Sequence, residues 1–286
     1  MKKKITSVVS IVLTVILVMS VFTACGGSKS GADKVKLIDI ALTDELYAFG
    51  VSKNDAELLD AVNEYIAEVK ANGTLDAINE KYFGSGTPEG VVSAEKGDSE
   101  NQLVVVTNAE FAPFEYKKGD TYYGVDMELV KGLADKLGKE LVILNVDFDS
   151  VTSNVEAGYA DLAVAGLTVN EKRQKQVNFS ESYYTASQYL IALADDTKFD
   201  NCKTAADVEA VLNAFDSSVQ IGYQSETTGQ YYVNGDADWD FAGFNVTGKG
   251  YDSGALAATD MINGNLSYVI IDAAPAEFIV NSINGK

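Results

Sequence analysis

Arg173 is the residue with the clearest chemical meaning, because it is the only arginine among 22 basic residues, the other 21 being lysines. The planar guanidinium group binds a carboxylate through two parallel hydrogen bonds, which a lysine cannot reproduce. Arg173 follows an apolar stretch, DLAVAG (161–166), that predicts a strand, and open α/β sheets bind ligands beyond the carboxyl ends of their strands. A lysine-rich chain can also keep a single surface arginine that has no function. Arg173 is therefore a candidate for holding a ligand carboxylate, with the surface alternative left open.

The composition excludes several kinds of site. The sequence has no histidine, which excludes a Ser-His-Asp or Cys-His nucleophile, a histidine-ligated zinc and an imidazole base. The formal net charge of −20 argues against nucleic-acid binding, which needs a basic surface. Asp236, Asp238 and Asp240 imitate the start of a calcium loop, but Phe241 stands where such a loop needs glycine. We predict no metal and no cofactor.

The first 25 residues predict export. A basic stretch, Lys2 to Lys4, precedes an apolar run from Ile5 to Phe22, and small residues stand before Cys25. This pattern resembles the lipobox of bacterial lipoproteins, in which the cysteine is acylated and becomes the first residue. Phe22 departs mildly from the leucine that is usual at that position. The resemblance implies a signal peptide at 1–24 and lipidation of Cys25.

Two interpretations of this segment place the folded part outside the cytoplasmic membrane. The alternative to cleavage is an uncleaved anchor, because 18 mostly apolar residues nearly span a bilayer. Under the lipoprotein interpretation, residues 25–33 form a lipid-anchored tether, since small residues favour flexible coil. Cys202 then has no disulfide partner and remains a lone thiol. We expect a monomer anchored on the extracytoplasmic face of a bacterial cell membrane.

The remaining sequence predicts an α/β architecture. Its 47% hydrophobic and 22% charged residues are typical of a globular protein. A helix that Asn54 or Asp55 caps and Gly73 ends is followed by a second helix at 74–82 and by a Gly- and Ser-rich linker at 84–102. Beyond the linker, strands are predicted at 103–108, 140–146, 161–166, 187–195, 219–223, 241–246 and 267–271, and helices at 125–137, 149–157, 205–213, 253–263 and 273–281. Such alternation implies mostly parallel sheet covered on both faces.

From Asn101 to about Asn284 the sequence resembles the polar amino acid substrate-binding proteins of ABC importers. The resemblance is carried by FAPFEYKKGDTYYGVDMELVKGLADKLG, VDFDSV, DLAVAGLTVNEKRQKQVNFSESYY, IGYQSETTGQYY and SYVIIDAAPAEF. It implies a two-lobed, periplasmic-binding-protein-like fold of type II. It also implies a function, the capture of a free amino acid and its delivery to a membrane permease.

The order of the segments differs from that of the family. A stretch similar to the one that closes the family's chain here spans 46–84, before the first of the resembling blocks. The carboxyl end, PAEFIVNSINGK, stops where the family continues into a stretch like KVKLIDIALTDELYAFGV. The resemblance therefore implies a circular permutation in which 84–102 joins the ancestral ends. Such a change is tolerated when the old termini lie close together at the surface.

The permutation also determines the expected domains. The resemblance implies two crossing strands, near Leu46 to Ser52 and near Ser187 to Leu193. Lobe 1 is then continuous from about 45 to 186. Lobe 2 comprises 187–286 together with a short piece near 34–44.

The resemblance implies a set of residues that hold the ligand's carboxylate. Arg173 takes the α-carboxylate, helped by Thr168 and by backbone N–H groups around Gly166. Thr227 and Thr228 add hydrogen-bond donors from the second lobe. The ligand is captured when the two lobes close around it.

The same resemblance assigns the ligand's ammonium group and side chain. Asp272 takes the ammonium group, because a buried zwitterion needs a fixed anion as well as a fixed cation. Phe111 and Phe148 enclose the side chain as apolar walls, with core packing as the alternative for each ring.

Selectivity depends on four further residues. Asn108 and Gln224 form an uncharged pair, which favours a neutral polar ligand such as glutamine, because a cationic side chain would lack a buried counter-ion. Glu110 and Glu226 leave the alternative of lysine or arginine open, should either enter the cleft. A second alternative is a dehydratase-like enzyme that uses Glu110 or Glu226 as a general acid, since a few proteins resembling the family are dehydratases.

Overall fold

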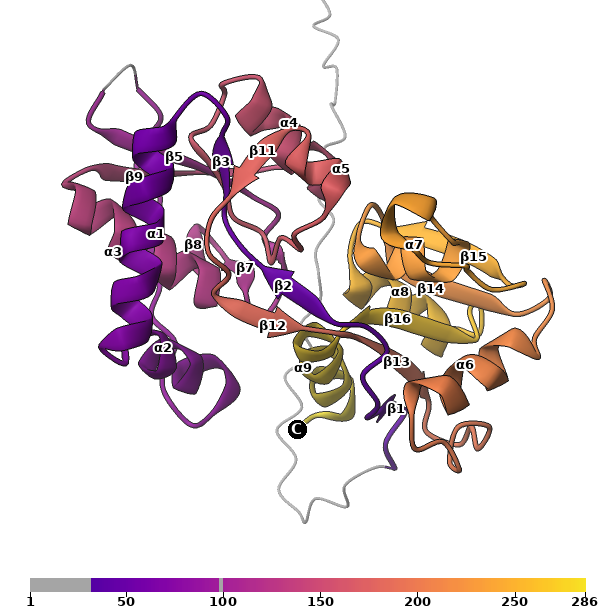
Figure 1. Cartoon of the computed structure of the whole chain (residues 1–286). Coiled ribbons are helices and arrows are strands. Elements are labelled where there is room, and N and C mark those ends of the chain that lie inside the picture. Colours follow the sequence, from indigo (N-terminus) through magenta and orange to yellow (C-terminus); the bar gives the residue numbers. More distant parts are fainter. Residues whose placement is uncertain (1–31, 98–99) are drawn as a thin grey trace, which may run out of the picture. The chain divides into compact units, whose positions relative to one another are not determined.

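The computed structural model describes residues 32–97 and 100–286 (Figure 1). The predicted signal peptide, Cys25 and the tether as far as residue 31 lie outside the described residues. Residues from Asp33 to Lys286 belong to one folded unit. Within the described ranges, no helix combines the length and the apolar character needed to cross a bilayer.

Lobe 1 is built on a five-stranded sheet in which β5 is mostly buried along its length. β5 runs parallel to both of its neighbours, and β3 is antiparallel to the two strands beside it. The prediction of mostly parallel sheet is therefore right for β5 and the two strands beside it, and wrong for β3. The strand order is β11 (Val177–Phe179), β3 (Gly50–Ser52), β10 (Leu162–Ala163), β5 (Gln102–Thr107), β9 (Glu140–Asn145). The helices are α1 (Ala56–Ala71), α2 (Thr74–Phe83), α3 (Val125–Leu137), α4 (Val151–Glu156), α5 (Glu171–Gln174), with the 3₁₀ turn η1 (Phe148–Ser150).

Lobe 2 is built on a second five-stranded sheet. β14 runs parallel to β15 and β16, whereas β13 is antiparallel to β1 and β16. The strand order is β1 (Val35–Ile38), β13 (Gln188–Leu193), β16 (Tyr268–Asp272), β14 (Gln220–Gln224), β15 (Thr247–Tyr251). The helices are α6 (Ala205–Asn213), α7 (Thr228–Asn234), α8 (Gly254–Ile262), α9 (Ala273–Asn284), with the 3₁₀ turn η2 (Ala237–Trp239).

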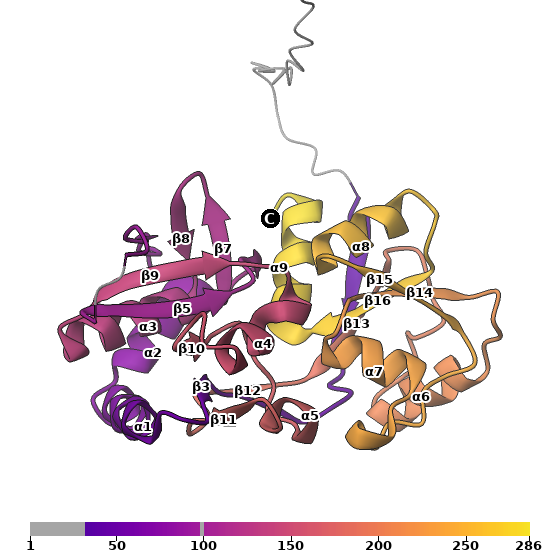
Figure 2. The ribbon, with the colours of Figure 1, turned by 90° about the horizontal axis from the view of Figure 1, so that it is seen from above.

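Two short strands connect the sheets. β2 (Glu45–Tyr47) and β12 (Tyr184–Ala186) pair antiparallel, and they run side by side between the two sheets in Figure 1. The chain passes from β1 through β2 into β3, and again from β11 through β12 into β13. Figure 2 shows the two sheets at either end of these crossings. A pair of narrow crossings restricts relative motion to bending about them.

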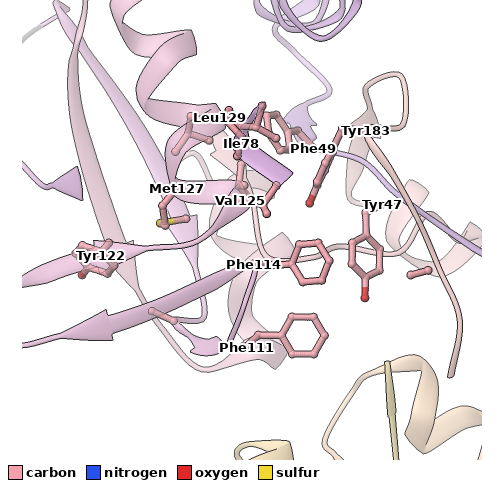
Figure 3. Packing of buried hydrophobic residues seen from close by; sticks show 14 of the residues in the cluster. Tyr47, Phe49, Ile78, Phe111, Phe114, Tyr122, Val125, Met127, Leu129 and Tyr183 are labelled. Carbon is pink, nitrogen blue, oxygen red and sulfur yellow. The ribbon is translucent and has the colours of Figure 1, made fainter. Parts of the chain in front are cut away.

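Aromatic packing joins the core of lobe 1 to the crossing strands. Tyr47 packs edge-on against Phe114 with ring centroids 5.1 Å apart, and Phe49 packs against Tyr183 at 5.0 Å (Figure 3). Phe111 stacks on Phe114 at 6.0 Å, farther along the same cluster. Because Tyr47, Phe49 and Phe114 are fully buried, this cluster fixes where β2 leaves the lobe.

The predicted linker at 84–102 is partly regular. Val91 is buried and lies in β4 (Val91–Val92), which pairs with β8 (Thr121–Tyr123). The backbone N–H of Ala94 donates to the carbonyl of Leu141 at 2.8 Å. Two valines among Gly, Ser and charged residues give too short a pattern to predict a strand. The small sheet is completed by β7 (Glu115–Lys118) and β6 (Glu110–Phe111).

The predicted ends of α1 and the strand predicted at 241–246 can be compared with the structure. Asp55 caps α1 by accepting from the backbone N–H of Leu58, and the helix ends just before Gly73, which has φ of +80°, so these predictions are confirmed. The strand predicted at 241–246 is wrong, because the strand is β15. Gly248 and Gly250 make β15 hard to recognise in the sequence, because glycine is unfavourable inside a strand. The structure explains both glycines, since a Cβ at these positions would lie 2.1 and 2.5 Å from neighbouring side-chain atoms.

The two ends of the described unit lie together. Lys286 pairs with Asp33 at 2.8 Å, and the side-chain carbonyl of Asn284 accepts from the backbone N–H of Lys34 at 2.9 Å. The amide group of Asn284 also donates to the carbonyl of Val35. The end of α9 is therefore attached to the start of β1.

Candidate functional site

Nine of the ten residues that the sequence predicts for ligand binding surround one small cavity between the lobes. Its volume is about 10 Å³, which is close to the space that one water needs. The tenth predicted residue, Asn108, does not line the cavity, but it is hydrogen-bonded to Gln224, which does. The lining residues are Phe111, Phe148, Ala165, Gly166, Thr168, Arg173, Gln224, Thr227, Thr228 and Asp272.

Arg173 extends from the short helix α5 into the contact between the lobes. Asn170 caps this helix and accepts from the backbone N–H of Arg173 at 2.8 Å. The guanidinium group donates to the carbonyl of Thr168 in lobe 1 at 2.8 Å and to that of Glu226 in lobe 2 at 3.1 Å. It also lies 5.2 Å from the ring centre of Phe148. Burial lowers the pKa of Arg173, and anionic neighbours oppose this effect.

Asp272 supplies a buried carboxyl group from the other lobe. It is the last residue of β16 and is 4% exposed. The phenol of Tyr47, on the crossing strand β2, donates to it. The pKa of Asp272 is raised to about 7, first by burial and then by the negative charge of Glu45, while hydrogen bonds from Tyr47 and Gln188 oppose the rise. The site therefore brings together a cation from lobe 1 and an acid from lobe 2.

Glu45 contacts two residues of the cavity lining, Thr168 and Thr228, and it is not predicted from the sequence. It lies on β2, is 5% exposed, and faces the same side of the strand as Tyr47. Its Oε1 accepts from Thr43 at 2.7 Å and from Gln188 at 2.9 Å. In the sequence, nothing distinguishes it from Asp44 beside it. The available signal is its spacing of two residues from Tyr47, next to a predicted crossing strand.

The threonine hydroxyls are engaged as donors within the protein. Thr168 in lobe 1 and Thr228 in lobe 2 both donate to Oε2 of Glu45, at 2.8 and 2.6 Å. Thr227 donates to the carbonyl of Gln224 at 2.7 Å. The resemblance predicts that these threonines help to bind a ligand carboxylate, whereas in the structure Thr168 and Thr228 donate to the carboxylate of Glu45.

Asn108 and Gln224 meet across the two lobes. The side-chain amide of Gln224 donates to Oδ1 of Asn108 at 3.0 Å, and Asn108 donates to the carbonyl of Val146 at 2.8 Å. Among the described residues, Oε1 of Gln224 has no hydrogen-bond partner although it is buried. A buried carbonyl oxygen normally accepts a hydrogen bond. This atom is thus suited to a donor group of a ligand.

The described residues that line the cavity do not include Glu110 or Glu226. Glu110 is exposed on β6 and borders a separate hollow of about 450 Å³ beside α8 and α9. Glu226 accepts from the phenol of Tyr231 and pairs with Lys172 at 3.3 Å, contacts that lower its pKa. Its φ of +60° is the left-handed conformation that favours glycine.

Three aspartates border a separate hollow next to Asn108. A hollow of about 180 Å³ is bordered by Asn108 and Phe148, and by Asp147, Asp149 and Asp252. The three aspartates are exposed. The sequence reasoning did not single them out, because they come from loops of both lobes that are far apart in the chain.

The model for bacterial extracellular solute-binding proteins, family 3, matches residues 2–85 and 103–247. The chain belongs to this family. Arginine-binding extracellular protein ArtP of Bacillus subtilis is 40% identical over 94 residues, which are 33% of this chain and 37% of that protein. ABC transporter arginine-binding protein 1 of Escherichia coli is 29% identical over 168 residues, 58% and 61% of the two chains. The alignments thus cover less than two thirds of either relative.

An ancestral arginine-binding protein of the same type has been solved with two ligands. The arginine complex has a TM-score of 0.54 and 27% identity, covering 65% of this chain and 77% of that one. The glutamine complex has a TM-score of 0.53 and 28% identity, covering 64% and 75%. These neighbours confirm the two-lobed α/β fold. Cyclohexadienyl dehydratase of Pseudomonas aeruginosa, an enzyme, is also similar, with 28% identity over 95 residues, 33% of this chain and 35% of that protein.

Proposed function

We propose that this solute-binding protein captures an amino acid between its lobes outside the cytoplasmic membrane and delivers it to an ABC importer permease. The observation that carries the proposal is the shared cavity of Arg173 and Asp272, which come from opposite lobes. A zwitterion buried there would find a fixed cation for its carboxylate and a fixed anion for its ammonium group. Phe111 and Phe148 would supply apolar walls.

Capture requires the lobes to separate and close. A cavity of about 10 Å³ is far smaller than an amino acid, so the ligand enters only when contacts between the lobes open. These contacts include the bonds from Arg173 to Glu226 and from Gln224 to Asn108. Bending at β2 and β12 would open them, and a ligand that bridges both lobes would stabilise the closed form by its differential contacts.

The ligand class that we propose is a cationic amino acid, with arginine first. Two relatives and the solved ancestral protein are named for arginine, which favours the cationic alternative over our expectation of glutamine. The free Oε1 of Gln224 would accept from a guanidinium or ammonium group. The acidic hollow beside Asn108, rather than Glu110 or Glu226, would attract the charged end of the side chain.

Glutamine remains the second candidate. The neutral Asn108–Gln224 pair suits an uncharged amide side chain, and the ancestral protein was solved with glutamine as well as with arginine. The dehydratase alternative relied on Glu110 or Glu226 as a general acid. Because the cavity lining includes neither carboxylate, the site gives this alternative no support.

Calorimetric titration of residues 26–286 with arginine, lysine, citrulline and glutamine tests the proposal. We expect arginine to bind at least about tenfold more tightly than citrulline, its neutral isostere, because a buried cation finds counter-charges in this site. Tighter binding of glutamine would support the second candidate. The seventeen other standard amino acids are then screened by thermal shift; absence of binding by all twenty would reject the function, and conversion of a ligand would establish an enzyme.

The proposed function also implies where the protein is located. The family is extracellular by its description, and we propose that Cys25 carries the lipid that holds the chain at the outer face of the membrane. The tether to residue 33 would leave the lobes free to meet a permease. A monomer is sufficient for this function, because both halves of the site belong to one chain.

We also propose that the chain is circularly permuted relative to its family. The family model matches two segments on either side of 86–102, and the ion pair of Asp33 with Lys286 shows that the two ends of the folded unit are adjacent. A variant that joins Lys286 to Lys34 by a short Gly-Ser linker and opens between Thr87 and Pro88 tests the idea. We expect it to fold and to keep its ligand affinity within about threefold, since the lobes are unchanged. The same joined chain opened after the buried Leu141 should not fold, and failure of the first variant as well would contradict the permutation.

A further inference from the structure

We propose that Glu45 is a positioning and specificity residue of the ligand site: it holds the Thr168 and Thr228 hydroxyls as acceptors for the ligand's ammonium group and adds a second fixed negative charge. The inference rests on the proposed function as an amino acid-binding protein. It assigns a role to a buried carboxylate that lies on a crossing strand, outside the set of residues expected from the sequence.

The positioning role of Glu45 is inferred from its hydrogen bonds. Glu45 accepts four hydrogen bonds, two at each oxygen, from Thr43, Gln188, Thr168 and Thr228. The unprotonated carboxylate accommodates four donors of this kind. A hydroxyl has one proton to donate, so each threonine that donates to Glu45 presents only lone pairs to its other neighbours. Those lone pairs can accept from an ammonium group, and they would repel a carboxylate.

The arrangement depends on the lobes being together. Thr168 follows β10 in lobe 1, Thr228 begins α7 in lobe 2, and Glu45 stands on the crossing strand between them. The two hydroxyl oxygens lie 3.4 Å apart. Both hydroxyls therefore face the same point only in the closed form, which makes the acceptor pair part of the closed site.

The specificity role of Glu45 is inferred from the charges buried around the cavity. Arg173 is one buried cation beside two buried acidic residues, Glu45 and Asp272, and Glu45 is near enough to raise the pKa of Asp272. A third buried acid, Asp126, lies behind Gly166 and is occupied by hydrogen bonds from the backbone N–H of Gly166 and the phenol of Tyr183. Once a ligand carboxylate occupies Arg173, two negative groups remain for the rest of the ligand. A cationic amino acid brings two positive groups and balances them. A neutral amino acid leaves one buried negative charge unpaired, which is unfavourable.

The test compares ligands that differ in one group. In Glu45→Gln we expect the preference for arginine over citrulline to fall at least about tenfold, measured as the ratio of Kd values by calorimetry. The exposed neighbour provides the control, because Asp44→Asn removes the same charge outside the site and should keep the ratio. A structural role for Glu45 would weaken both ligands equally, and an unchanged ratio would overturn the specificity role.

A second variant tests the positioning role and covers the case in which Glu45→Gln does not fold. Thr228→Val should weaken arginine at least about tenfold more than 5-guanidinopentanoate, the analogue that lacks the ammonium group. Equal weakening of both ligands would show that the hydroxyl binds the carboxylate, and would overturn the inference. The unmodified protein is titrated in the same series. Failure of that protein to bind any amino acid would reject the proposed function itself, whereas normal binding with unchanged variant ratios would reject only the role of Glu45.

Discussion

Replacing Arg173 by lysine is expected to remove amino acid binding almost completely while leaving the fold intact. The guanidinium group is 8% exposed and donates to both lobes, through the carbonyls of Thr168 and Glu226. An ammonium group keeps the charge but cannot form two parallel bonds to a carboxylate. Each hydrogen bond to a charged group that the lysine cannot form is worth about 1.5 to 3 kcal/mol, which is about tenfold to more than a hundredfold in Kd.

The measurement is a calorimetric titration with arginine, accompanied by thermal unfolding without ligand. Lys175, the exposed residue that caps the end of the same helix, offers a matched control. Lys175→Ala should bind arginine normally. Normal binding by Arg173→Lys would show that the carboxylate is held elsewhere, and a large fall in the melting temperature would show that the lysine variant fails through its fold.

Arginine affinity is expected to fall steeply as the pH is lowered through 7. In the proposed site, Asp272 would pair with the ligand's ammonium group only when it is ionised, and its pKa is raised to about 7 by burial and by Glu45. Below that pH the protonated form predominates, so binding must expel a proton. Arginine itself keeps its charges between pH 5 and 8. Between pH 7.5 and pH 5.5 we therefore expect Kd to rise by about tenfold or more.

Asp272→Asn identifies the group that titrates. The variant should bind weakly at every pH and should lose most of the pH dependence, whereas the exposed Asp39→Asn should behave like the unmodified protein. Asp126 must be separated from it, because burial raises the pKa of Asp126 to about 6 and its carboxylate accepts from the backbone N–H of Gly166. Calorimetry in buffers of different ionisation enthalpy counts the protons released. A pH dependence that persists in Asp272→Asn would assign it to Asp126 instead.

Some residues in and around the candidate site can be predicted from the sequence, and others cannot. Arg173 is recognisable because it is unique in the chain and follows a predicted strand, and its burial supports the ligand-binding interpretation over the surface alternative. Asp272 was placed by resemblance alone. Glu45 was missed because an acidic residue beside Asp44 gives no periodic or compositional signal. Its meaning comes from Thr168 and Thr228, which approach it from different lobes.

The weakest sequence inference concerned the ligand. It relied on the charge of the side chains at four positions, and two of these, Glu110 and Glu226, do not line the cavity. Glu226 instead bonds to Tyr231 and pairs with Lys172. The sequence could not reveal the pair with Lys172, because it joins α5 of one lobe to the loop before α7 of the other.

The sequence by itself determined the alternation of helices and strands, the caps of α1, the family and nearly all of the cavity lining. These features depend on local spacing, on turn residues and on blocks of sequence that remain contiguous. The tertiary structure alone decided that glycine-rich 247–251 is a strand, that Val91 joins a sheet, and that Glu45 accepts hydrogen bonds from threonines of both lobes. Each of these depends on partners distant in the chain, since sheet pairing and buried hydrogen bonds are formed by groups that meet only after folding.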